Sequence, residues 1–187
     1  CSPYRASDYS YPQSIEARIV ESLGGIWSPY TGRTFASRRE TDIEHIVARS
    51  EAHDSGLCAA TVETRRRFAT DLLNLTLASP EVNRGQKGAR DAAEWRPDRN
   101  QCWFADRVVD VRQKYSLTID RREADALDRV LASCASTALV RGGARVAARV
   151  DPGGRSGELP AEVAQWDDNG NGRITCAEAR THGIAPV

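Results

Sequence analysis

Five cysteines constrain this chain more than any other feature of its sequence. They are Cys1, Cys58, Cys102, Cys134 and Cys176. None of them forms the C-x-x-C pair that is typical of a zinc site, so their use favours disulfides made in an oxidising compartment. Because the number is odd, at most two bonds can form within the chain and one thiol remains.

A predicted helical hairpin brings two of these cysteines together. Apolar residues recur at helical spacing over about 99–116 and 120–134, and the two helices are expected to run antiparallel. Cys102 and Cys134 each lie 16 residues from Thr118 at the tip of the hairpin. At 1.5 Å per residue both lie about 24 Å from that tip, level with each other. We therefore predict a Cys102–Cys134 disulfide.

The other three cysteines allow three pairings, of which only one can form. We favour Cys1–Cys58, because Cys176 belongs to a tail loop with constraints of its own. Cys1 could instead carry the lipid of a bacterial lipoprotein, which we consider the weaker alternative. The chain contains no methionine, which leads us to expect that a secretion signal has been removed.

Length and composition indicate a folded globular body with a small appendage. The 187 residues are 40% hydrophobic and 28% charged, and no apolar run approaches the roughly 20 residues that cross a bilayer. The 26 basic and 26 acidic residues balance, so no overall field draws the chain toward nucleic acid. We predict a body over 1–134, a linker rich in glycine, arginine and alanine over 135–157, and an acidic tail over 158–187.

The body is predicted to be α+β. Helical spacing covers 14–23 and 61–72, and alternating patterns favour strands over 41–47 and 73–78. Ser79-Pro80 is expected to begin a short helix.

The tail matches the whole pattern of an EF-hand calcium loop. Calcium takes about six to eight oxygen ligands, and the spacing supplies them with Gly172 at the sharp turn. The expected ligands are Asp167, Asn169, Asn171, the carbonyl of Arg173, Thr175 and bidentate Glu178. The simpler alternative is a polar turn between two helices. With one loop and two charged ligands, weak Ca²⁺ affinity is expected.

A second group of residues in the body suggests phosphodiester hydrolysis. Each member alone is an ordinary polar residue, but together they supply a base, oxygen ligands for a hard metal ion and cations for phosphate. The group consists of Glu44, His45, Asn74, Asn83, Arg84 and Lys87.

The sequence around these residues resembles the HNH, or ββα-metal (His-Me finger), endonucleases. D-I-E-H-I-V at 42–47, D-L-L-N-L at 71–75 and V-N-R-G-Q-K-G at 82–88 look like the family's signatures in order. D-A-A-E-W-R-P at 91–97 is similar to a motif of secreted bacterial relatives of the GmrSD nuclease domain. The resemblance covers roughly 14–134 and implies a ββα-metal core.

By this resemblance, His45 is the general base and Asn74 orients it. Glu44 and Asn83 would hold Mg²⁺ or Mn²⁺, while Arg84 and Lys87 would bind phosphate. Many family members carry Asp where this chain has Glu44.

We therefore expect a monomeric, metal-dependent endonuclease that is secreted by a bacterium and cleaves DNA or RNA. The alternative is a catalytically inactive, calcium-dependent cell-surface binding module on the same scaffold. The sequence leaves open whether His53 has a structural or a substrate-related role. The run Arg65–Arg67 is equally open between a phosphate-binding face and a solvated one.

Overall fold

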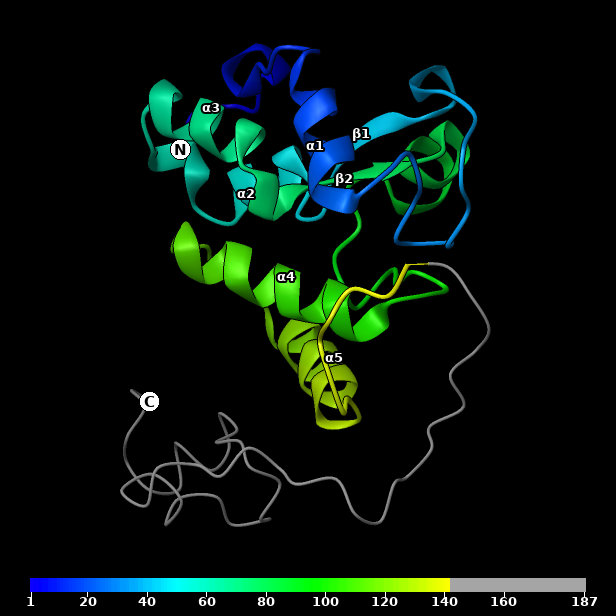
Figure 1. Ribbon diagram of the computed structural model, residues 1–187. Coiled ribbons are helices and arrows are strands. Elements are labelled where there is room, and N and C mark those ends of the chain that lie inside the picture. The colour runs from blue at the N-terminus through cyan, green and yellow to red at the C-terminus, as the bar shows by residue number, and fades with distance from the viewer. Residues whose placement is uncertain (142–187) are drawn as a thin grey trace, which may run out of the picture. The chain divides into compact units, whose positions relative to one another are not determined.

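A two-stranded antiparallel sheet lies among five α-helices in the computed structural model, which describes residues 1–141 (Figure 1). The helices are α1 (Ile15–Leu23), α2 (Arg49–Asp54), α3 (Val62–Thr70), α4 (Gln101–Lys114) and α5 (Arg121–Ala132), and the strands are β1 (Asp42–His45) and β2 (Leu75–Ala78). Shorter turns are η1 (Ala6–Tyr9), η2 (Arg38–Glu40), η3 (Leu57–Ala59), η4 (Leu72–Asn74) and the π-helical η5 (Glu81–Lys87). The body is thus a mostly helical α+β fold, as predicted. The predicted calcium loop lies outside the described residues.

The sheet is buried on both faces. The register places Glu44 opposite Thr76 and His45 opposite Leu75. All of β2 is buried, so polar side chains on these strands need partners inside the protein. Helix α1 covers one side and ends at Gly24, whose left-handed φ of 66° suits a residue without a Cβ. The apolar cluster between α1 and the sheet comprises Ile15, Ile19, Ile43, Leu75 and Leu77.

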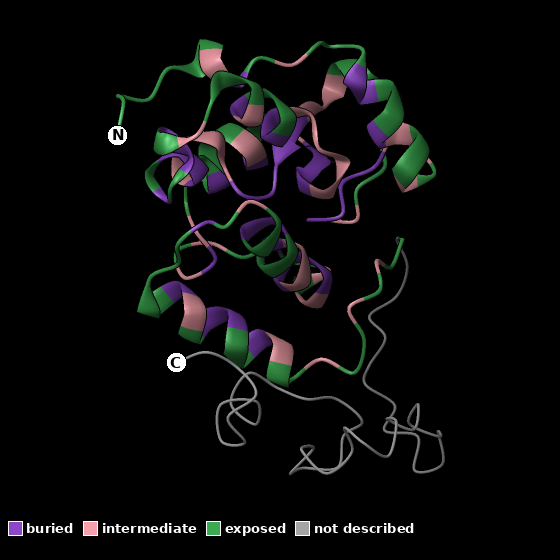
Figure 2. Cartoon of the chain, turned by 90° about the vertical axis from the view of Figure 1, so that its left-hand side faces the viewer, coloured by how far each residue is buried: buried purple, intermediate pink, exposed green. Residues whose placement is uncertain are grey.

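Helices α4 and α5 form the predicted hairpin below the sheet layer in Figure 1. Each helix has buried residues on one side and exposed residues on the other (Figure 2). The buried residues Phe104 and Val108 of α4 and Leu127 and Val130 of α5 belong to the main hydrophobic core. Asp120 caps α5 by accepting a hydrogen bond from the backbone N–H of Glu123 at 2.9 Å.

Both predicted disulfides are present. Cys102 and Cys134 are bonded with their Cα atoms 5.8 Å apart, which closes the open end of the hairpin. Cys1 is bonded to Cys58, with a Cα separation of 4.8 Å. The first bond follows from helix geometry, whereas the second joins segments that only the folded chain brings together.

The second strand is shorter than predicted. Asp71 accepts a hydrogen bond from the backbone N–H of Leu73 at 3.1 Å and caps the 3-10 turn η4. This local bond competes with the extended conformation. We had expected Asn74 to lie in the strand. It instead ends a turn immediately before β2.

Residues 135–141 return to the body, although their composition suggested a flexible linker. The side chain of Asn100 donates to the carbonyl of Val140 at 3.2 Å and accepts from its N–H at 3.0 Å. Leu139 packs against the main core. The start of the predicted linker is thus attached to the body, while the domain boundaries beyond residue 141 stay a prediction.

A buried arginine joins the hairpin to α2. The guanidinium of Arg112 pairs with Glu51 at 2.8 Å and with Glu123. It also donates to the Ser55 hydroxyl and the Thr118 carbonyl. Burial raises the pKa of Glu123, although the positive charge of Arg112 opposes the shift. Without Arg112 these acidic groups would lose the cation that stabilises their charge.

Replacing Arg112 should therefore destabilise the body strongly. We expect Arg112→Ala to lower the free energy of unfolding by about 3 kcal/mol, because it leaves the buried Glu123 carboxylate and the partly buried Glu51 carboxylate unpaired. The measurement is urea unfolding at pH 7, with Arg129→Ala on the exposed side of α5 as the control. Equal unfolding midpoints for the two variants would contradict the assignment.

Candidate active site

A pocket of about 230 Å³ lies where β1 and η5 meet. It brings together Glu44 and His45 from β1 with Asn83 and Arg84 from η5. The rest of its wall consists of Tyr4, Tyr11, Ile43, Ala48, Arg49, Ser50, Gly88 and Ala89. Four of the six residues selected from the sequence thus share one pocket. The other two, Asn74 and Lys87, support it from within the protein.

The imidazole of His45 is held in one orientation. Its Nε2 lies 3.1 Å from the carbonyl oxygen of Ala69. A carbonyl only accepts, so Nε2 carries the proton and Nδ1 keeps a lone pair. The ring stacks on Phe68 at 6.4 Å and lies 5.2 Å from the ring of Tyr11, measured between centroids. His45 is therefore oriented as a neutral proton acceptor.

Its surroundings keep His45 neutral over a wide pH range. Burial lowers the pKa of His45 to about 3, and the positive charges of Arg49 and Lys87 add to the shift. The hydrogen bond to Ala69 opposes it. A phosphate bound in the pocket would bring negative charge beside the ring and raise this pKa toward the range in which an imidazole is an effective base.

Asp42 organises the two residues from η5. Its carboxylate accepts from the guanidinium of Arg84 at 2.7 and 2.6 Å, a bidentate pair, and from the amide Nδ2 of Asn83 at 2.9 Å. With Nδ2 committed to Asp42, the amide oxygen of Asn83 is the atom left to bind a ligand. The guanidinium of Arg84 is largely exposed and keeps further N–H groups for an anion.

Lys87 does not lie where the sequence suggested. We expected its ammonium at the phosphate, but the side chain is fully buried. Its Nζ lies 2.8 Å from Glu44 Oε1 and donates to the His45 carbonyl at 3.0 Å. Burial raises the pKa of Glu44, and the charge of Lys87 opposes that shift. Lys87 thus positions β1 and the Glu44 carboxylate, and Arg84 remains as the phosphate-binding candidate.

Asn74 positions the chain just beyond His45, and not its ring. The side chain of Asn74 accepts from the Val47 N–H at 2.7 Å and donates to the Val47 carbonyl at 3.1 Å. Its backbone carbonyl accepts from the N–H of Ile46 at 2.9 Å. These three bonds fix the turn that follows β1. The role of orienting the ring belongs to the Ala69 carbonyl.

The donors in the pocket suit a hard, largely hydrated cation. Glu44 and Asn83 supply oxygen atoms, which Mg²⁺ prefers, and Mg²⁺ usually keeps several waters. Within residues 1–141, no three His, Cys, Asp or Glu side chains gather as a metal cluster. Metal binding here would therefore rest on few protein ligands together with substrate phosphate.

Sequence reasoning missed Asp42, which holds two side chains of the pocket, and several residues that line the pocket. Asp42 precedes Glu44 by two, and alternation along β1 could have placed both on one face. Arg49 follows the D-I-E-H-I-V segment at 42–47, and no sequence pattern marks it as a residue of the pocket. Tyr4 and Tyr11 reach the pocket from the N-terminal segment, which no local pattern connects to β1.

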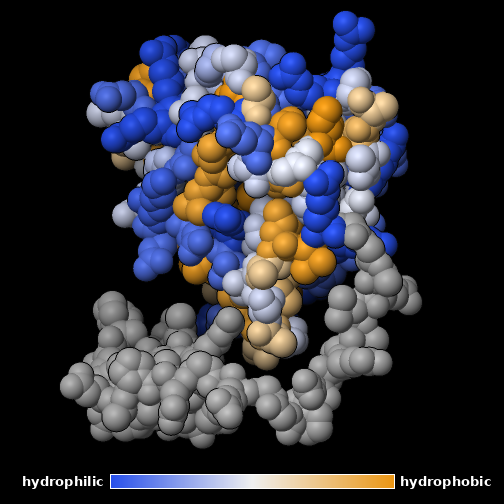
Figure 3. All heavy atoms as spheres, in the orientation of Figure 1, coloured by the Kyte–Doolittle hydropathy of each residue, from blue (hydrophilic) through white to orange (hydrophobic). Residues whose placement is uncertain are grey.

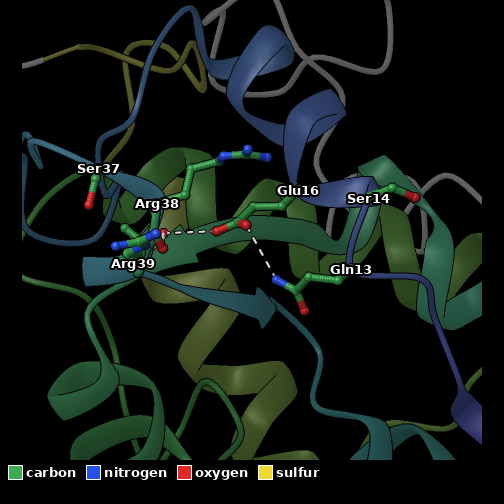
Figure 4. A pocket seen from close by; sticks show the side chains of 7 residues that line it. Gln13, Ser14, Glu16, Ser37, Arg38 and Arg39 are labelled. Atoms are coloured by element: carbon green, nitrogen blue, oxygen red, sulfur yellow. Dashed lines mark hydrogen bonds between the residues drawn. The ribbon is translucent and has the colours of Figure 1, made fainter.

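A larger pocket of about 630 Å³ lies between α1 and η2. Glu16 points into it and accepts from Thr41 Oγ1 at 3.1 Å and from Gln13 Nε2 at 3.3 Å (Figure 4). This carboxylate thereby links α1 to the start of β1. None of the residues predicted for the nuclease site lines this pocket.

His53 has a structural role in this arrangement. Its ring is buried, with Nδ1 2.9 Å from the Tyr9 hydroxyl and Nε2 2.7 Å from the Ser2 carbonyl. Both ring nitrogens are thus used to hold the N-terminal segment.

The depressed pKa of His45 predicts a loss of stability in mild acid. An unfolded histidine takes up a proton near pH 6.5, whereas the folded one does so near pH 3. Between these values the unfolded state binds more protons, so stability falls as the pH falls. From pH 7 to pH 5 the loss from this residue should be about 2 kcal/mol.

The measurement is urea unfolding at both pH values in EDTA, for the wild type and His45→Asn. The variant should lose correspondingly less stability between pH 7 and pH 5. Because the two proteins differ only at position 45, the contributions of all other groups cancel. Parallel losses in the two proteins would show that His45 is not buried in its neutral form.

Comparison with known proteins assigns the chain to a family. Residues 8–129 match the C-terminal domain of GmrSD restriction endonucleases. An uncharacterized secreted protein of the fungus Arthroderma benhamiae is 30% identical over 123 residues, which are 64% of this chain and 60% of that protein. No solved structure matches. The secreted relative and the two disulfides indicate an extracellular location, but the fungal source does not support the bacterial origin we expected.

Within residues 1–141 no helix is long and apolar enough to cross a membrane. The match over 8–129 includes β1, β2, η5, α4 and the first part of α5, and hence every residue that β1 and η5 contribute to the pocket. The chain belongs to the family of GmrSD restriction endonuclease C-terminal domains.

Proposed function

We propose that the chain is a secreted, metal-dependent endonuclease that hydrolyses phosphodiester bonds of DNA or RNA on a ββα-metal core. One observation carries this proposal: a single pocket gathers His45, Glu44, Asn83 and Arg84 in a chain that belongs to a nuclease family. These groups are a proton acceptor, two oxygen donors and a cation for phosphate.

His45 would act as the general base. Its Nδ1 carries the lone pair and would take a proton from the attacking water, while the Ala69 carbonyl stabilises the imidazolium through Nε2. The aromatic rings around it fix the plane of the imidazole, so Nδ1 needs no reorientation during the reaction. Arg84, held from behind by Asp42, would bind a non-bridging phosphate oxygen.

Glu44 and Asn83 would hold the divalent ion, which neutralises charge that develops on the phosphate and the leaving oxygen. Lys87 fixes the Glu44 carboxylate from the buried side. Asn83 is neutral and Lys87 balances the charge of Glu44, so these protein groups would supply little net negative charge to the ion. Substrate phosphate would therefore complete the binding of the ion.

The first test is digestion of plasmid DNA and of RNA with Mg²⁺, Mn²⁺, Ca²⁺ or EDTA. Mg²⁺ or Mn²⁺ should support cleavage and EDTA should abolish it. His45→Ala should lower the rate about 10²- to 10⁴-fold, the usual contribution of a general base. Asn83→Ala should raise the Mg²⁺ concentration for half-maximal rate by about tenfold or more.

Glu81→Ala is the matched control, because Glu81 is exposed on the same turn η5 and does not line the pocket. It should cleave as the wild type does. A folded wild-type protein without cleavage under any of these conditions would favour the inactive binding module. An unchanged Mg²⁺ requirement in Asn83→Ala would place the ligands elsewhere.

We also propose that the tail binds Ca²⁺ through the loop 167–178, on the strength of its sequence pattern alone. Calorimetric titration of the full chain should show a Ca²⁺ site with a dissociation constant of about 10⁻⁴ to 10⁻³ M, the range of extracellular modules. Glu178→Ala should remove it, and Glu158→Ala, outside the loop, should retain it. Retention of this site in Glu178→Ala would contradict the proposal.

A further inference from the structure

One exposed aromatic ring lies in the wall of the active-site pocket. The large hydrophobic side chains exposed within residues 1–141 are Tyr4, Val62, Val109, Ile119 and Val140. Of these, Tyr4 alone lines the pocket that contains His45 and Arg84. On the face shown in Figure 3, hydrophilic residues lie mainly around the edge and hydrophobic residues gather in the centre. An apolar ring 39% exposed in a charged pocket is therefore a specific feature of this site.

Two rings support Tyr4 from behind. Its centroid lies 5.6 Å from that of Tyr9 and 5.5 Å from that of His53, in tilted and edge-on arrangements. Tyr9 and His53 are themselves buried and hydrogen-bonded to each other at 2.9 Å. The ring of Tyr4 thus rests on a fixed base while part of it remains open to the pocket.

The backbone on both sides of Tyr4 is anchored to the body. Cys1 is bonded to Cys58, and the carbonyl of Ser2 lies 2.7 Å from His53 Nε2. The buried guanidinium of Arg65 binds the Ser2 hydroxyl at 2.9 Å and the Asp8 carboxylate at 2.8 Å. Residues 1–9, which we call the N-terminal strap, are thereby held over α2 and α3.

We propose that Tyr4 is a substrate-binding residue whose ring stacks on a nucleobase next to the scissile phosphate. This inference rests on the proposed nuclease function and specifies how the same pocket binds its substrate.

The chemistry of the pocket supports a nucleobase as the partner of this ring. Arg84 and Arg49 provide positive charge for the phosphate, and His45 lies among them for the reaction. A nucleotide has a flat apolar base attached to the charged group that these arginines attract. Bases stack on aromatic side chains with little preference for sequence, so one ring can serve many substrates. Stacking also requires an unpaired or displaced base, which favours single-stranded substrates.

The test uses oligonucleotides with one cleavable phosphodiester flanked by methylphosphonate linkages. Three versions are compared: one with both bases next to the cleavable bond, and two that lack the base on its 5′ or its 3′ side. Tyr4→Ala should lower kcat/KM on the complete substrate by about tenfold. On one of the two abasic substrates wild type and variant should be equal, because the partner of the ring is missing.

Tyr4→Phe keeps the ring and should behave as the wild type, whereas Tyr4→Leu keeps apolar volume without a ring and should resemble Tyr4→Ala. Melting curves verify that each variant is folded. If the wild type cleaves and Tyr4→Ala loses the same factor on all three substrates, or nothing on any, the stacking role is wrong while the nuclease function stands. If the folded wild type cleaves neither these substrates nor plasmid DNA or RNA, the nuclease function itself fails.

Discussion

The pocket depends on one buried ion pair between η5 and β1. Lys87 places its ammonium 2.8 Å from Glu44 and 3.0 Å from the His45 carbonyl. Both side chains are almost completely removed from water, at a desolvation cost that only close pairing offsets. Such a pair is a weak source of stability but tolerates little displacement. It therefore fixes the distance between the strand that carries His45 and the turn that carries Asn83 and Arg84.

Charge within the site is arranged in two layers. In the inner layer Lys87 balances Glu44, and in the outer layer Arg84 balances Asp42. The inner pair is closed to solvent, whereas the outer pair leaves the guanidinium of Arg84 accessible. The chain as a whole is neutral, so attraction of a polyanion would depend on this local exposure and not on a general basic field.

The sequence predicted those parts of the structure that local rules determine. Helix spacing placed Cys102 opposite Cys134, and both bonded as expected. Alternation identified both strands, although the predicted ranges 41–47 and 73–78 extend beyond β1 and β2. The start of β2 was misjudged because a single side-chain bond from Asp71 replaced extended backbone by a turn. The selection of Glu44, His45, Asn83 and Arg84 for one site agrees with the pocket that contains all four.

What the sequence could not predict are the directions of side chains and the approach of distant segments. A lysine three residues after an arginine in a polar segment gives no sign that one is buried and the other exposed, since this depends on which side of η5 faces the sheet. The contact that Asn74 makes was likewise not predictable, because its bonds to Val47 exist only after η4 packs against the turn beyond β1.

One disulfide follows from local helix geometry and the other from the approach of distant segments. This difference bears on how the pocket is built. The Cys102–Cys134 bond joins two helices that already pack along their length, so it reinforces a contact that hydrophobic burial favours. The Cys1–Cys58 bond secures the strap, a segment whose only regular structure is the short turn η1. A strap of this kind has few buried apolar residues of its own and needs the crosslink, Arg65 and His53 to stay in place. Since the strap contributes Tyr4 to the lining of the pocket, an oxidising environment helps to maintain the shape of this pocket.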